Sequence, residues 1–151
     1  MLAAILLLST LTSTMQIAPP PGGGERLVIS GTMFLADGRT PARGVTLFAY
    51  HTNTKGVYVK RDDTPYGLSG RLKTDANGRY RIETIRPGGY PGRRDPAHIH
   101  LVLEPSKAHI DEIVFDDDPR TESIRGKRGY AIVKVVKRNG VWTGTHNITL
   151  R

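Results

Sequence analysis

Short hydrophobic runs alternate with polar turns along most of the chain, and this pattern predicts strands with little helix. Successive side chains of a strand point to opposite faces of its sheet, so a two-residue alternation indicates a strand with one buried face. Residues 79–85, Arg-Tyr-Arg-Ile-Glu-Thr-Ile, follow this alternation. From other hydrophobic runs, further strands are predicted at residues 26–35, 44–51, 98–103, 109–115, 130–137 and 141–150.

Turns rich in Gly separate these strands. Asp37-Gly38 and Thr74–Gly78 mark tight turns, because Asp-Gly and Asn-Gly tolerate positive φ angles, and Arg138–Gly140 would join the last two strands as a hairpin. Residues 52–70 form a long polar loop, which in a small domain is usually functional or disordered, and residues 120–129 hold at most a helical turn. Seven to nine short strands at this spacing predict an all-β fold, an antiparallel β-sandwich.

Composition agrees with a single globular domain. A chain of 151 residues with 38% hydrophobic and 24% charged residues buries roughly two-thirds of its unfolded surface, enough for a core. The sequence contains no cysteine. This excludes disulfides, iron–sulfur clusters and thiolate zinc sites, so any metal ligands must be nitrogen or oxygen atoms.

The first 18 residues differ from the rest. Met1–Leu8 is apolar and a Ser/Thr run follows to Thr14, which resembles the apolar core of a secretory signal peptide and is too short for a membrane span. Residues 19–25, rich in Pro and Gly, are predicted as a linker, and residues 26–151 as the sandwich domain. We therefore expect a secreted or periplasmic protein without a membrane span, with the cytoplasm as the alternative.

The strand at residues 98–103 carries two histidines on one face. His98 and His100 project together because they are two residues apart, and Ile99 points away. Paired imidazoles on a rigid strand supply half of a metal site, although a single His is more often a surface or hydrogen-bonded residue. Tyr90 lies in the Pro/Gly-rich bend just before this strand, close enough to turn its phenol toward the same point. These three residues are therefore candidate metal ligands.

The formal net charge of +8 raises the question of an anionic partner. No nucleic-acid-binding motif accompanies the charge, aromatic residues make up 7% of the chain, and the basic residues are scattered. A solvated basic surface is therefore favoured over a nucleic-acid interface. A narrower alternative is a field that attracts a small anionic substrate, because four arginines lie near the histidine strand in sequence: Arg71, Arg86, Arg93 and Arg94.

Three motifs carry a family resemblance. They are Thr74–Pro91, which includes Arg-Pro-Gly-Gly-Tyr-Pro, then Pro96-Ala-His-Ile-His100, then Phe115-Asp-Asp-Asp-Pro119. With these motifs, the segment from Gly31 to Pro119 resembles the intradiol ring-cleavage dioxygenases, the family of protocatechuate 3,4-dioxygenase and catechol 1,2-dioxygenase. The family fold is a β-sandwich, in agreement with the strand pattern.

The resemblance implies one non-haem Fe(III) ion held by two Tyr and two His. The first family Tyr lies in a loop before a Gly-Arg pair, and Tyr58 stands in that place before Gly70-Arg71, with Tyr66 as the alternative. The implied ligands are Tyr58, Tyr90, His98 and His100. Phenolate is a hard, anionic oxygen donor that suits ferric iron, and two phenolates offset two of its three charges.

The resemblance also implies a reaction. A catechol would chelate the iron, and Tyr90 would leave the metal and accept a substrate proton, acting as ligand and general base in turn. With O₂, the ring would open between its two hydroxyl-bearing carbons to a cis,cis-muconate-type diacid. The implied partners are therefore a small catecholic substrate and O₂.

The chain departs from the family pattern at two positions beside the site. Asp95 stands where the family commonly has an Arg that stabilises developing negative charge, so Arg93 or Arg94 would have to serve as the catalytic cation. Glu112 stands where the family commonly has a Gln on the following strand. By this comparison we assign Arg71 and Glu112 to substrate binding.

A rival interpretation comes from another class of protein. Ser30-Gly-Thr, Gly44-Val-Thr and Thr74–Tyr80 also fit the noncatalytic transthyretin-like and carboxypeptidase-regulatory-like sandwiches, which bind or space other domains. Such a module needs neither a metal nor the two Tyr and two His together. Asp116–Asp118 could indicate Ca²⁺, but the run lacks EF-hand spacing and an acidic end of a turn is favoured.

Overall fold

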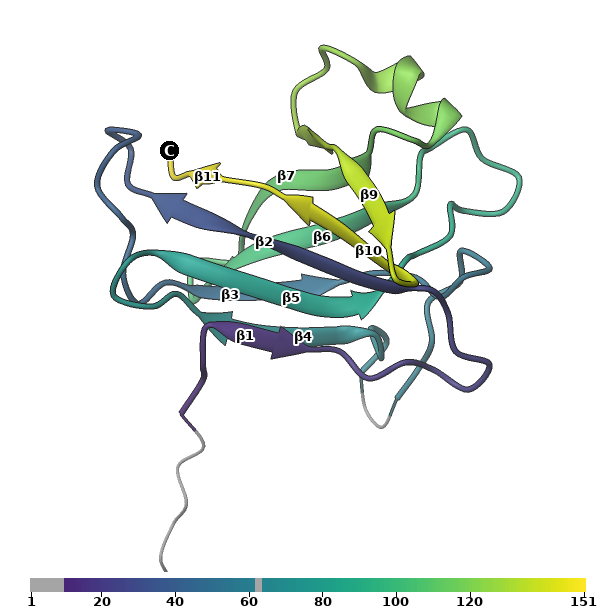
Figure 1. The fold of residues 1–151 in the computed structure, drawn as a ribbon, viewed down its shortest axis with the longest axis horizontal. Helices are drawn as coiled ribbons and strands as arrows, with labels where there is room; N and C mark the ends of the chain where they lie inside the picture. The colour runs from purple at the N-terminus through teal and green to yellow at the C-terminus, as the bar shows by residue number, and fades with distance from the viewer. Residues whose placement is uncertain (1–9, 62–63) are drawn as a thin grey trace, which may run out of the picture.

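Strands form nearly all of the regular structure in the computed structural model, which describes residues 10–61 and 64–151. The first sheet has the order β1 (Thr14–Gln16), β5 (Arg79–Ile85), β2 (Arg26–Phe34), β10 (Val141–Thr145) and β9 (Val135–Arg138), with β11 (Ile148–Thr149) also on β2. The second sheet has the order β4 (Ser69–Lys73), β3 (Thr46–Tyr50), β6 (His98–Glu104), β7 (Ala108–Phe115) and β8 (Tyr130–Val133). In Figure 1 the first sheet lies in front of the second, and the 3₁₀ helix η1 (Pro119–Ile124) lies above the strands.

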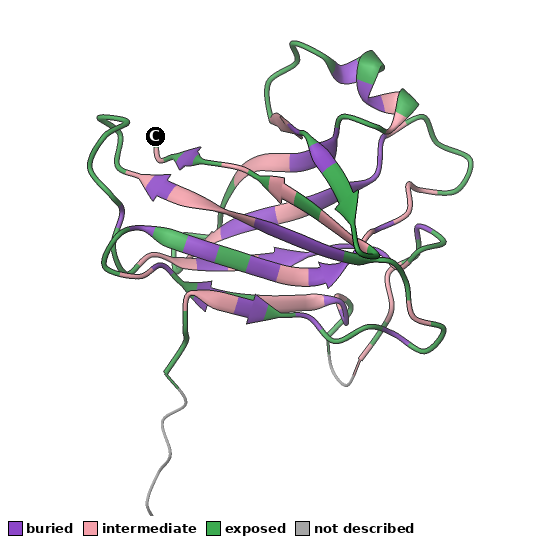
Figure 2. Ribbon diagram, in the orientation of Figure 1, coloured by how far each residue is buried: buried purple, intermediate pink, exposed green. Residues whose placement is uncertain are grey.

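The core lies between the two sheets. Figure 2 shows exposed and buried residues alternating along the first residues of β5, as the sequence pattern predicts for a strand with one inner face. Leu27 and Ile29 of β2 and Ile99 and Leu101 of β6 are fully buried in one hydrophobic cluster. Because Ile99 and Leu101 point inward, the alternation of β6 turns His98 and His100 to the outer face of the second sheet.

The predicted sandwich is confirmed, but its sheets are mixed and not purely antiparallel. Four pairings are parallel: β1 with β5, β10 with β2, β11 with β2, and β7 with β8. Parallel neighbours need a crossover connection. For the three parallel pairs of the first sheet the chain passes through the second sheet between the paired strands, and for β7 and β8 it passes through η1. Alternation within a strand does not record the direction of its neighbour, so the sequence pattern could not reveal these pairings.

The single strand predicted at residues 130–137 is divided between the sheets. β8 pairs with β7, whereas β9 pairs with β10 across the predicted Arg138–Gly140 hairpin, which is confirmed. Asp116 fixes the crossing point: its backbone N–H donates to Val133 O and its Oδ1 accepts from Val135 N, both at 3.0 Å. The hydrophobic run continues through the crossing because both strands contribute to the same core.

The folded part of the chain begins earlier than the predicted boundary at residue 26. β1 lies within the segment 1–18 and pairs with β5, and both Met15 of β1 and Ile17 directly after it are buried in the core cluster. Residues 19–25 therefore connect two strands of the same sheet and do not precede the domain. The apolar run 1–8 lies outside the described residues, and its role as a signal peptide stays a prediction. Within the described ranges, no helix has the length and apolarity to cross a bilayer.

One buried histidine makes the stability of the fold depend on pH. His51 is 1% exposed, with Nδ1 2.7 Å from Thr52 O and Nε2 2.7 Å from the Thr84 hydroxyl. Burial lowers the pKa of His51 to about 4, against about 6.5 in an unfolded chain. Below pH 6.5 the unfolded chain binds a proton that folded His51 does not. The free energy of unfolding should therefore fall between pH 6.5 and 4, by up to about 3 kcal/mol.

Urea denaturation at pH 7.5, 6, 5 and 4 measures this dependence. The control is His51→Gln, whose amide keeps a hydrogen-bonding side chain without a titrating group. The variant is expected to be less stable at pH 7.5 and to lose less stability on acidification. Equal pH dependence in both proteins would assign the acid sensitivity to other groups.

Candidate metal centre

Four side chains from three segments converge at one end of the second sheet. His98 and His100 come from the start of β6, Tyr58 from the loop between β3 and β4, and Tyr90 from the loop between β5 and β6. The Tyr58 oxygen lies 2.6 Å from the Tyr90 oxygen and 2.9 Å from His100 Nε2. His98 Nε2 lies 3.1 Å from both the Tyr90 oxygen and His100 Nε2, and the Tyr90 oxygen lies 3.3 Å from His100 Nε2.

This spacing is that of a ligand shell around one metal ion. Atoms bound about 2 Å from a central ion lie roughly 3 Å from one another. The two Nε2 atoms are the most informative pair, because two imidazole nitrogens 3.1 Å apart need either a proton on one of them or a cation between them to relieve the repulsion of their lone pairs. Two phenols and two imidazoles are nitrogen and oxygen donors, as the absence of cysteine requires.

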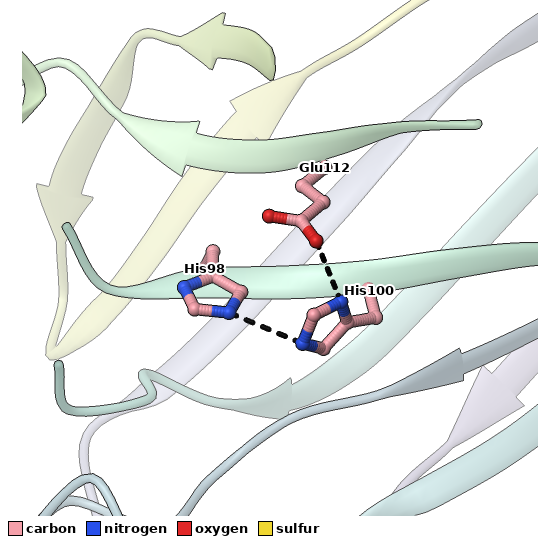
Figure 3. A group of neighbouring side chains, drawn as sticks. All are labelled: His98, His100 and Glu112. Carbon is pink, nitrogen blue, oxygen red and sulfur yellow. Dashed lines mark hydrogen bonds and ion pairs between the residues drawn. The ribbon is translucent and has the colours of Figure 1, made fainter. Parts of the chain in front are cut away.

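The far side of each imidazole is held by an acceptor. His98 Nδ1 lies 2.8 Å from Pro96 O, so its N–H donates to the backbone and Nε2 is left free for a metal. His100 Nδ1 is buried and makes no well-aligned hydrogen bond, but the Glu112 carboxylate lies 2.8 Å from it (Figure 3). That contact is an ion-pair approach, and the negative charge still favours a proton on Nδ1.

Glu112 therefore supports a histidine, whereas the sequence comparison assigned it to substrate binding. His98, His100 and Glu112 form a group whose ligand atoms lie within 4.8 Å of one another. Glu112, however, faces Nδ1 of His100, on the opposite side of the ring from the converging Nε2 atoms (Figure 3). A single ion bound by both Nε2 atoms is out of its reach. Burial alone would raise the pKa of Glu112, but the adjacent His100 lowers it below the usual range and keeps the carboxylate charged.

A β-bulge aims Glu112 at the site. The register between β6 and β7 shifts between Ile99 and Leu101, which pair with Ile113 and Ile110. Two residues of β7 therefore lie opposite His100 alone. Such a bulge re-aims side chains and is common beside active sites.

The Tyr58 phenol is protonated unless a cation is present. Burial, and a hydrogen bond in which the Tyr58 hydroxyl donates to Tyr90, raise the pKa of Tyr58 far above its usual range. A phenolate at this position therefore needs a metal ion, whose charge can deprotonate a coordinated group outright. The Tyr58 phenol would therefore ionise only beside a bound cation of high charge.

Comparison with known proteins identifies the family to which this cluster of Tyr and His side chains belongs. The family model described as Dioxygenase matches residues 9–124. The chain is 39% identical over 92 residues to the protocatechuate 3,4-dioxygenase beta chain of Burkholderia cepacia, covering 53% of this chain and 39% of that protein. It is 36% identical over 100 residues to catechol 1,2-dioxygenase of Acinetobacter baylyi, covering 53% of this chain and 32% of that one. The chain belongs to the intradiol ring-cleavage dioxygenase family.

A solved structure extends the likeness to nearly the whole domain. The dioxygenase domain of a dioxygenase–carbohydrate-binding protein fusion from Streptomyces sp. SirexAA-E has a TM-score of 0.72 and 26% identity. The alignment covers 89% of this chain and 85% of that domain. By contrast, the matches to the two curated relatives span only 39% and 32% of their lengths. This intradiol dioxygenase domain is therefore comparable in extent to the fused domain.

An aromatic stack covers the His100 ring, and the arrangement around it distinguishes between Tyr58 and Tyr66 as the first tyrosine ligand. Tyr50, opposite His100 on β3, stacks on it with ring centres 4.4 Å apart, and Tyr66 packs on Tyr50 at 4.2 Å. Tyr58, and not Tyr66, brings its oxygen to the donor cluster. The alternative position for the first family Tyr is therefore not supported by the geometry. Sequence reasoning missed Tyr50, and only the β3–β6 register could have revealed it.

The predicted arginines have different surroundings. Arg93 lies with its guanidinium 5.5 Å from the Tyr90 ring centre, but it is paired with Asp95 at 2.7 Å. Arg94 is exposed. Arg71 forms a two-pronged pair with Glu104, at 2.8 and 3.0 Å, and covers Phe48. The structure thus brings only Arg93 beside a metal-ligand candidate, and it leaves Arg71 engaged elsewhere.

Proposed function

We propose that this domain is a non-haem Fe(III) intradiol dioxygenase that opens a catechol-type ring between its two hydroxyl-bearing carbons, using O₂. The observation that supports the proposal is the convergence of the Tyr58 and Tyr90 oxygens with Nε2 of His98 and His100, at 2.6 to 3.3 Å. A transthyretin-like spacer module would have no use for this arrangement.

The four side chains form a suitable set for ferric iron. Tyr58 and Tyr90 would bind as phenolates and His98 and His100 as neutral imidazoles, which leaves one net positive charge on the centre. With Tyr90 released, two positive charges would remain, and a catechol dianion would balance them. Bound Fe(III) would supply the activation of the catechol toward O₂. The stacked Tyr50 and the Glu112 carboxylate would hold the His100 ring in place during turnover.

Tyr90 is suited to move a proton. Its oxygen lies 2.6 Å from that of Tyr58 and 3.1 Å from His98 Nε2, within hydrogen-bond reach of any hydroxyl that enters the cluster. On release from the metal it would take a proton from the catechol. Arg93, over the Tyr90 ring, would offer positive charge to the developing anion once it separates from Asp95.

The test is spectroscopic and chemical. Protein loaded with Fe(III) should show a visible tyrosinate-to-iron band that shifts when catechol is added without air. On admission of air, catechol should disappear with one O₂ consumed and a cis,cis-muconate-type diacid formed. A protein that retains no iron would contradict the proposal. So would an iron-loaded protein that binds catechols but converts none of them to a ring-opened diacid.

A further inference from the structure

The three acidic residues of Asp116–Asp118 have three separate tasks. Asp116 accepts from Val135 N at 3.0 Å, where the chain crosses between the sheets. Asp117 forms a two-pronged pair with Arg86, with both contacts at 2.8 Å. Asp118 accepts from Ala97 N at 2.9 Å. Each carboxylate is engaged with the protein, so this turn is a structural frame and not a calcium site.

Asp118 joins the histidine strand to η1. Its side chain is 8% exposed, and Ala97, whose N–H it accepts, directly precedes His98. The same carboxylate caps η1 by accepting from Arg120 N at 3.0 Å and pairs with the Arg120 guanidinium at 3.1 Å through Nε and Nη2. Burial would raise the pKa of Asp118, but these contacts lower it below the usual range.

Arg120 in turn lies against the tyrosine loop. Its guanidinium packs on Gly89, directly before Tyr90, so closely that a Cβ on Gly89 would clash with it. The pairing of Nε and Nη2 with Asp118 fixes the plane of the guanidinium. One ion pair thus contacts the chain next to His98 and next to Tyr90, whose donor atoms are 3.1 Å apart.

We propose that Asp118 and Arg120 form a positioning pair that sets the place of Tyr90 relative to His98 in the metal centre. The inference rests on the proposed function. Neither residue contacts the donor atoms, so both act through Ala97 and Gly89. Without the pair, the tyrosine loop loses its support and the Tyr90 oxygen shifts relative to His98. The Tyr90–metal bond, which must form and release in turnover, would weaken.

Two substitutions separate this role from general stability. Asp118→Asn keeps a good N-cap for η1, because Asn and Asp cap equally well, but one amide cannot both accept from Ala97 and pair with Arg120. Arg120→Met keeps a long side chain and removes the guanidinium fork. The matched control is Glu122→Gln, which breaks the exposed Glu122–Arg125 pair of the same helix.

The experiment measures the energy of the tyrosinate-to-iron band and the Fe(III) affinity by chelator competition, below the melting temperature of each protein. We expect both variants to shift the band and to bind Fe(III) about tenfold more weakly. A tenfold loss is the lower limit of the loss in metal affinity that is usual when a residue supporting a ligand indirectly is substituted. Glu122→Gln should match the wild type in both. A variant that only lowered stability would melt earlier but keep the wild-type band.

The outcomes distinguish the two proposals. An unmodified protein with no tyrosinate-to-iron band would refute the proposed function, whatever the variants do. A band in the unmodified protein that stays unchanged in energy and affinity in both Asp118→Asn and Arg120→Met would refute the positioning pair alone. A band shift of the same size in Glu122→Gln would also refute it.

Discussion

A Tyr58→Phe variant is expected to lose most of the tyrosinate-to-iron absorption and to bind Fe(III) more than about 100-fold more weakly. Substitutions outside the ligand shell already cost 10- to 100-fold, and this one removes an anionic ligand. The remaining set, Tyr90, His98 and His100, would neutralise one charge less. The Phe ring keeps the packing against Tyr50 and Tyr66, so the melting temperature of the metal-free protein should change little. Chelator competition and visible absorption measure the loss.

Tyr66→Phe is the matched control, because it removes a hydroxyl from the same loop and the same aromatic group. Its iron affinity and band should equal those of the unmodified protein, since the Tyr66 oxygen takes no part in the hydrogen bonds that join the donor atoms. If Tyr66→Phe lost the iron and Tyr58→Phe kept it, the assignment of the first tyrosine ligand would be wrong.

Much of the site could be predicted from local periodicity in the sequence. The placement of His98 and His100 on one face, and of Ile99 in the core, follows from the two-residue period of a strand, and β6 confirms it. Tyr90 could be placed near them because only a short loop separates it from the strand. Tyr58 is 40 residues away from His98 in the chain. Only the family resemblance pointed to it, since no local rule brings its loop to β6.

Features that depend on how strands pair could not be predicted. The support of His100 by Glu112 needs a β-bulge between β6 and β7, and the stack of Tyr50 on His100 needs the β3–β6 register. The direction of neighbouring strands could not be predicted either, because it also depends on pairing. For this reason the sequence pattern led us to expect an antiparallel sandwich. From its composition, the segment 1–18 was predicted to be a signal peptide. Its residues Met15 and Ile17, however, pack in the core, where β1 pairs with β5.

Gly56→Ala is expected to separate the two tyrosine loops. Gly56 has φ of 75°, and a Cβ there would clash with the carbonyl oxygen of Gly89, next to Tyr90. The loops are further joined by hydrogen bonds from the Thr52 hydroxyl to Gly88 O at 2.7 Å and from Gly88 N to Asn53 O at 2.8 Å. Backbone strain plus this clash should lower the free energy of unfolding by about 3 kcal/mol. Iron affinity should fall as Tyr58, two residues on, moves away from Tyr90.

Gly92→Ala separates the effect of backbone strain from the effect of the Cβ clash. Gly92 also has a left-handed φ, 69°, and lies in the Tyr90–His98 loop, but a Cβ there meets no atom within 4 Å. It carries only the backbone strain, about 1 kcal/mol, and should keep the iron and its band. Denaturation and iron titration of both variants compare the two positions. Equal effects would mean that left-handed backbone alone explains the loss at Gly56. A larger effect on iron at Gly56 would show that close packing of two glycine-rich loops brings the two phenols together.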